Sequence, residues 1–149
     1  MRNIRGHGAL VLAAGLLLAS CGADPTNFAA SPADTTANKI TGSVYEWGID
    51  VSAQKATEGE VIFVIANFGT IAHEFIVVKT DYEVGKIPLG ANNRFDEEGE
   101  GVEAIDEIKE FPVNTSEVLT VNLEAGDYQL LCNIAGHYAN GMYAALTVS

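Results

Sequence analysis

The chain has few side chains that bind soft metals and few basic residues. Its 149 residues include only two cysteines, two methionines and three histidines, and eight Lys and Arg stand against twenty Asp and Glu. The formal net charge is −12, and phosphate backbones repel so acidic a surface, so nucleic acid is not an expected partner. Hydrophobic residues still make up 48% and charged residues 19%. Such a composition can bury a core, which excludes wholesale disorder.

The N-terminal apolar run is too short to span a membrane. Ala9–Ala19 has eleven residues, whereas a spanning helix needs about 20. With Arg2 and Arg5 before it, this run predicts a secretory signal peptide over residues 1–20. The segment ending in Ser20 and Cys21 resembles the lipobox of bacterial lipoproteins, which implies cleavage before Cys21 and lipid attachment to it. An ordinary signal peptide with an incidental cysteine is the alternative.

The rest of the chain divides into a linker and one domain. Residues 21–39 are rich in Ala, Pro, Ser, Thr and Asp, a composition typical of a flexible tether. From residue 40 to 149, short β-branched or alternating runs predict strands at 61–67, 75–79, 118–124, 128–132 and 142–148. Short strands joined by turns predict an all-β fold, a β-sandwich.

Two segments of this domain have less regular patterns. From Tyr45 to Val51, apolar residues alternate with polar or small ones, which predicts a single strand with Trp47 in the core. Residues 81–111 have poor strand character and carry eight acids and one lysine between Asp96 and Glu110. They predict a long acidic loop or a short helix insertion, which is either a solvated surface or a docking surface for a basic partner.

The remaining soft ligands fall into one group. Without the signal peptide, and with lipid on Cys21, the chain keeps one free thiol, two imidazoles and one thioether, on Cys132, His73, His137 and Met142. A thiolate and two imidazoles with a weak axial thioether form the ligand set of blue copper. Zinc is the competitor, but its structural sites normally take four Cys or His ligands. We therefore predict one copper ion as the cofactor.

The spacing of these residues resembles a known family. Cys132-x-x-x-x-His137-x-x-x-x-Met142, with His73 upstream, is similar to the ligand pattern of the cupredoxins, or type 1 blue copper proteins, and the loop is closest to the rusticyanin and sulfocyanin types. The resemblance covers residues 40–149. It implies a cupredoxin-like Greek-key β-sandwich with copper at one end, and a one-electron carrier.

Two further residues are expected around the ligands. Asn67 opens the motif Asn67-x-Gly69-x-x-x-His73, which belongs to the same resemblance. Many cupredoxins have Asn or Ser after the first histidine, where it braces the ligand loop, but this chain has Glu74. An ionised carboxylate so close to copper would lower the reduction potential, whereas a protonated or outward-facing one would not.

The expected function is that of a membrane-tethered electron carrier in the cell envelope. The acidic surface favours basic redox partners, with c-type cytochromes or another copper protein as candidates. The alternative is a copper-binding or delivery protein without redox turnover. An enzyme is not expected, because no histidines remain to build a second copper centre. We expect a monomer, held by lipid as a periplasm-facing or outer-surface lipoprotein, and Gly22 after the cysteine favours the outer membrane.

Overall fold

The computed structural model describes residues 38–149. The predicted signal peptide, Cys21 and residues 22–37 of the predicted tether lie outside these described residues and stay predictions. The strands are β1 (Lys39–Tyr45), β2 (Gly48–Val51), β3 (Lys55–Ala56), β4 (Gly59–Asn67), β5 (His73–Thr80), β6 (Val102–Phe111), β7 (Ser116–Leu123), β8 (Gly126–Leu131) and β9 (Tyr143–Val148). Two short 3-10 turns, η1 (Ala91–Asn93) and η2 (Tyr138–Asn140), are the helical elements of this part. None of its helices is long and apolar enough to cross a bilayer.

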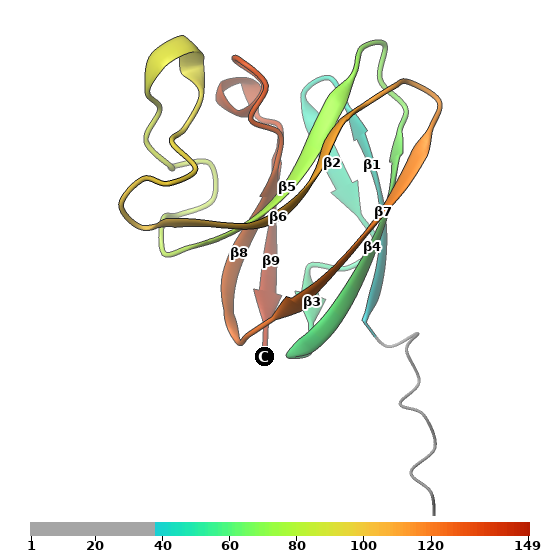
Figure 1. Cartoon of the computed structure of the whole chain (residues 1–149), viewed down its shortest axis with the longest axis vertical. Helices are drawn as coiled ribbons and strands as arrows, with labels where there is room; N and C mark the ends of the chain where they lie inside the picture. Colours follow the sequence, from blue (N-terminus) through green and yellow to red (C-terminus); the bar gives the residue numbers. More distant parts are fainter. Residues whose placement is uncertain (1–37) are drawn as a thin grey trace, which may run out of the picture. The chain divides into compact units, whose positions relative to one another are not determined.

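The strands form two sheets that face each other. One sheet has the order β2-β1-β4-β7 and the other the order β3-β9-β8-β5-β6. Most neighbours are antiparallel, but β1 pairs with β4 and β3 with β9 in parallel. Figure 1 shows the two layers, with β8 and β9 on one side and β1 and β4 on the other. This architecture confirms the predicted all-β Greek-key sandwich.

The main core lies between the sheets. Alternating residues of β4 supply Val61, Phe63 and Ile65, all at 0% exposure, and the facing sheet supplies Phe75 and Leu130. Side chains of a strand alternate between its two faces, so each strand gives every second residue to this layer. Phe63 and Phe75 meet across the layer with ring centroids 5.4 Å apart. The predicted alternation of residues 118–124 is also confirmed, because Leu119, Val121 and Leu123 are buried.

The predicted single strand from Tyr45 to Val51 is instead a hairpin. β1 ends at Tyr45 and β2 begins at Gly48, with Tyr45 and Gly48 paired across the turn. The turn changes which residues face inward, so Val44 and Ile49 are buried while Trp47 is 47% exposed. The prediction of a core Trp47 is therefore wrong. A glycine directly after Trp47 was the sequence signal for a turn.

The predicted loop or helix over residues 81–111 is only half correct. Residues 81–101 form a long connection, but Val102–Phe111 is an edge strand, β6, paired with β5. Register shifts interrupt this pairing at two places, and each such bulge breaks the two-residue alternation. The apolar residues Ile105, Ile108 and Phe111 are consequently three positions apart, a spacing that imitates a helix.

The 81–101 connection covers the outer face of the five-stranded sheet. Ile87 and Phe95 from the connection pack with Ile76, Val78 and other residues into a second buried cluster. This explains why β5 is buried along both faces and has a continuous β-branched run in its sequence. In Figure 1 the connection, coloured yellow, extends to one side of this sheet.

Candidate metal centre

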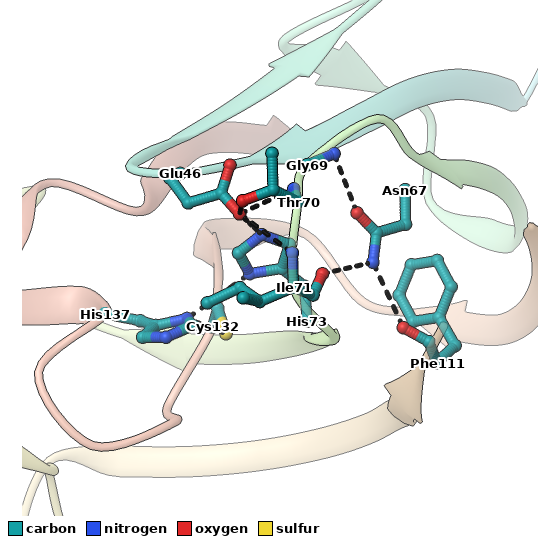
Figure 2. A network of polar contacts seen from close by, with 9 residues as sticks. All are labelled: Glu46, Asn67, Gly69, Thr70, Ile71, His73, Phe111, Cys132 and His137. Atoms are coloured by element: carbon teal, nitrogen blue, oxygen red, sulfur yellow. Dashed lines mark hydrogen bonds and ion pairs between the residues drawn. The ribbon is translucent and has the colours of Figure 1, made fainter. Parts of the chain in front are cut away.

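Three of the four predicted ligands meet at one end of the sandwich. His73 begins β5, Cys132 follows β8, and His137 lies in the loop between β8 and β9. Their donor atoms all lie within 4.8 Å of one another, and all three residues are buried. The Nδ1 atom of His137 is 3.3 Å from the Nδ1 atom of His73 and 3.3 Å from the Sγ atom of Cys132. Figure 2 shows the three side chains converging, His73 from β5 and the other two from the loop between β8 and β9.

The loop that carries Cys132 and His137 is held in a tight curl. Gly136 and Gly141 have φ values of 82° and 107°, in the left-handed region that glycine adopts without a steric penalty. The amide of His137 donates to Ile134 O at 2.8 Å, and the amide of Asn140 donates to Gly136 O at 3.1 Å. These bonds fold the loop back so that two ligands five residues apart point at the same place.

The fourth predicted ligand, Met142, is hydrogen-bonded through its backbone to His137 and Cys132. Its amide donates to His137 O at 3.2 Å, and its carbonyl accepts from the Cys132 amide at 3.2 Å. Its side chain is fully buried in the main core cluster. This places Met142 beside the ligand loop, and its role as the axial ligand stays a prediction.

The environment of the donors suits them for a metal. Burial lowers the pKa of both His73 and His137, so the imidazoles stay neutral and keep a lone pair for a metal. Burial raises the pKa of the Cys132 thiol to about 12, although the backbone amides of Glu74 and Ile134 oppose the shift. A buried thiol without a counter-charge keeps its proton, so a metal has to displace that proton on binding.

The distances fit an ion of the first transition row. Such an ion is held about 2.0–2.1 Å from imidazole nitrogen and about 2.3 Å from thiolate sulfur, which puts neighbouring donors roughly 3–4 Å apart. The separations of His137 Nδ1 from His73 Nδ1 and from Cys132 Sγ, both 3.3 Å, lie in that range. The donor set, one thiol and two imidazoles, suits a copper ion that changes valence.

Asn67, predicted to lie near the ligands, organises the loop before His73. Its side-chain amide donates to Ile71 O at 2.9 Å and to Phe111 O at 3.1 Å, and its Oδ1 accepts from the Gly69 amide at 2.9 Å. The residue is completely buried. Asn67 thus ties the 68–72 loop to the end of β6 (Figure 2) and acts on the site through His73.

Glu74 points away from the metal donors. Strand alternation places it on the same side of β5 as Ile76 and Val78, under the 81–101 connection. It is 6% exposed, and its Oε1 has no hydrogen-bond partner among the described residues. Burial raises the pKa of its carboxyl group, with the Asn133 amide and Arg94 opposing the shift. Together with burial, its negative charge still contributes to the raised pKa of the Cys132 thiol, so its effect on the reduction potential stays a prediction.

Sequence analysis did not single out Glu46, which lies over the buried edge of His73. Its Oε1 accepts from the amides of Thr70 and Ile71 at 2.7 and 3.0 Å and lies 3.5 Å from His73 Nε2. The Thr70 amide is the first of several hydrogen bonds that lower the pKa of this carboxyl group to about 2. The tight turn between β1 and β2 brings Glu46 to the site, so recognising that turn was the available signal.

Trp47, also unexpected here, covers His137. The two rings meet edge to face, with centroids 5.3 Å apart and planes at 86°. His137 is only 5% exposed, whereas Trp47 is 47% exposed. The side chain at the surface above this ligand is therefore the indole rather than the imidazole itself.

The ligand loop is also attached to the 81–101 connection. The side chain of Asn133 accepts from the Phe95 amide at 3.0 Å and donates to Phe95 O at 3.1 Å. The hydroxyl of Tyr138 accepts from the Ile87 amide at 3.1 Å and donates to Gln129 Oε1 at 2.9 Å. Asn133 and Tyr138 each follow a predicted ligand directly, so the connection braces the loop at both.

Comparison with known proteins agrees with this geometry. Residues 55–149 match the family described as the Sulfocyanin (SoxE) domain. No curated protein is significantly similar to the chain in sequence. Among solved structures, a reduced auracyanin from the photosynthetic bacterium Roseiflexus castenholzii is 24% identical with a TM-score of 0.55, over 75% of this chain and 97% of that one. A reduced rusticyanin is 17% identical with a TM-score of 0.54, over 75% and 80%. Auracyanin A, described as a "blue" copper protein from Chloroflexus aurantiacus, is 21% identical with a TM-score of 0.50, over 74% and 99%.

Proposed function

Because the chain belongs to the sulfocyanin family of type 1 blue copper proteins, we propose that it carries single electrons between redox proteins of the cell envelope. In this proposal His73, Cys132, His137 and Met142 hold one copper ion. The observation that carries it is the buried convergence of two imidazole nitrogens and one thiol sulfur. Copper held there supplies a one-electron couple between its two valence states.

In this function the protein holds the copper-binding side chains in a rigid arrangement. His73 is fixed by β5 and by the loop that Asn67 organises. Cys132 and His137 are fixed by a loop that hydrogen-bonds within itself and to the 81–101 connection. Ligands locked in this way move little when the valence changes, which lowers the reorganisation cost of electron transfer. We propose a carrier rather than an enzyme.

The exposed apolar side chains over His137 and in the loop before His73 suggest where electrons enter and leave. Trp47 lies against His137, and Phe68 and Ile71, from the loop before His73, are 70% and 44% exposed. Apolar side chains allow a partner to approach closely without desolvating charge, while the acidic remainder of the surface steers basic partners. A c-type cytochrome or another copper protein with a basic rim fits these requirements.

The first experiment is spectroscopic. The copper-loaded protein should show an intense thiolate-to-copper absorption band and a narrow hyperfine splitting in its EPR spectrum, and Cys132→Ser should lose both. A colourless wild-type protein would refute the proposed site.

Redox turnover needs its own test. Stopped-flow reduction and reoxidation by candidate cytochromes should be fast at low ionic strength and slow down as salt screens the acidic surface. Slow exchange with every candidate at all ionic strengths would count against the carrier. Release of copper to an acceptor apo-protein would favour copper delivery instead.

The tether is part of the proposal. We infer that lipid on Cys21 holds the domain at an envelope membrane through the 22–39 segment, which confines it near its partners and raises their effective concentration. The lipobox resemblance supports this inference. In a bacterial host that processes lipoproteins, wild-type protein should partition into membranes, the outer membrane preferentially, and Cys21→Ala should not. Equal partitioning of the two would refute the anchor.

A further inference from the structure

Glu46 has an arrangement that loop capping alone does not explain. Its carboxylate accepts two backbone amides, of Thr70 and Ile71, and the same Oε1 atom lies 3.5 Å from the Nε2 atom of His73. His73 Nε2 is a buried atom without a hydrogen bond among the described residues. Figure 2 shows Glu46 above the imidazole, on the side of the ring away from Cys132.

The tautomer of His73 follows from its role as a ligand. The Nδ1 atom faces His137 and Cys132, so it must keep its lone pair to bind the metal. The proton of the neutral ring then sits on Nε2, where Glu46 supplies the facing oxygen. Metal-binding histidines usually donate their second ring N–H to such a group, and this fixes the ring and raises its basicity.

Gly69 leaves room for this pair. A Cβ atom at residue 69 would lie 2.6 Å from His73 Nε2 and 2.9 Å from Glu46 Oε1. These distances are too short for any side chain, so the backbone passes close to the point where the two groups face each other. The Asn67 side chain holds the Gly69 amide in place.

We propose that Glu46 is a positioning residue that holds His73 in its Nε2-protonated, metal-binding orientation and, by its negative charge, favours the oxidised over the reduced state of the copper centre. This inference rests on the proposed copper site and adds a residue to it. The charge reaches the metal through the His73 ring, so Glu46 acts without touching the ion. It also differs from Glu74, whose side chain points to the opposite face of β5.

The test compares two variants that each remove one negative charge. Glu46→Gln keeps the shape and an acceptor oxygen for Thr70 and Ile71. Glu60→Gln is the control. Glu60 is exposed and pairs with Asn122 at the start of β4, whereas Asn67, which organises the loop before His73, ends that strand. Charges several ångströms apart in a partly buried site interact appreciably. We expect Glu46→Gln to lower the ratio of Cu(II) to Cu(I) affinity about tenfold, a rise in reduction potential of about 59 mV for one electron, and Glu60→Gln to change it by less than about twofold.

A second readout follows the His73 proton directly. In the full-length protein loaded with Cu(I) or Zn(II), both diamagnetic, NMR of ¹⁵N-labelled His73 should show a protonated Nε2 in slow exchange with solvent. Glu46→Ala should speed up this exchange at least tenfold, because the facing oxygen is lost. This measurement starts with the wild-type protein. It therefore shows whether His73 Nε2 carries a protected proton even if Glu46→Gln does not fold.

The outcomes separate this inference from the proposed function. If the copper-loaded wild type has no reversible one-electron couple, the carrier function fails, and the Zn(II) NMR experiment still tests Glu46. If the wild type cycles but Glu46→Gln and Glu60→Gln shift the potential equally, the inference about Glu46 is wrong. A His73 Nε2 without a protected proton in the wild type also overturns it.

Discussion

Replacing Asn133 by alanine should release the ligand loop from the connection that braces it. One side-chain amide of Asn133 satisfies both the N–H and the C=O of Phe95, at 3.0 and 3.1 Å, and also donates to Glu97 at 2.9 Å. Phe95 is 3% exposed, so its backbone groups have little access to water. In the variant they lose their partner while their surroundings remain apolar.

The magnitude follows from these contacts. An intramolecular hydrogen bond contributes about 1 kcal/mol net, and a buried group left without a partner costs about 1–3 kcal/mol. The Glu97 contact is partly exposed and adds little. If the connection loosens enough to admit water, the penalty falls towards the lower end. We therefore expect Asn133→Ala to lower the free energy of unfolding by about 2–3 kcal/mol.

Urea unfolding of the copper-free protein measures this change without interference from metal binding. A lower midpoint with an unchanged m-value indicates a loss of stability rather than a change in the unfolded state. Asn140→Ala is the matched control: its side chain bonds Gly136 O at 2.7 Å within the same loop, but at an exposed position. We expect this control to cost less than about 1 kcal/mol. Equal costs for the two variants would refute the idea that the connection braces the ligand loop.

Three other predictions concern the backbone, alkaline pH and metal loading. Gly141 has φ 107°, so Gly141→Ala should cost about 1–2 kcal/mol in thermal unfolding. An unchanged unfolding temperature would contradict the backbone argument. Tyr128 has its pKa raised, chiefly by burial, so the unfolded state loses this proton first and stability should fall as the pH rises above about 10. Tyr128→Phe should weaken that alkaline fall and cost about 1 kcal/mol at neutral pH, because the hydroxyl donates to Glu124 O at 2.9 Å; an unchanged alkaline profile would argue against it. Copper binding near pH 7 should release about one proton from Cys132, whose pKa is raised to about 12; calorimetry in buffers of different ionisation enthalpy measures this, and heats independent of the buffer would refute it.

The strands that sequence patterns located correctly are those whose burial pattern is regular along their whole length. β4 and β7 have either a continuous β-branched run or a strict alternation, because their surroundings are uniform along their length. β6 was missed because its bulges shift the register, and the turn at Glu46 and Trp47 was missed because the apolar alternation continues across it. Both errors arise where the hydrogen-bonding partner, rather than the residue's own preference, sets the conformation.

The amino-acid sequence by itself determined the chemistry of the centre, since so few soft ligands are present that His73, Cys132 and His137 were the natural choice. The chemical type of these donors, thiol and imidazole, is the same in any fold, and it is what favours a soft or borderline metal ion. Only the tertiary structure decided what surrounds them: Glu46 behind one imidazole, Trp47 over the other, and the 81–101 connection against the loop. These contacts join residues far apart in the chain, and no local pattern encodes them, because they depend on which strands pair and where each strand ends.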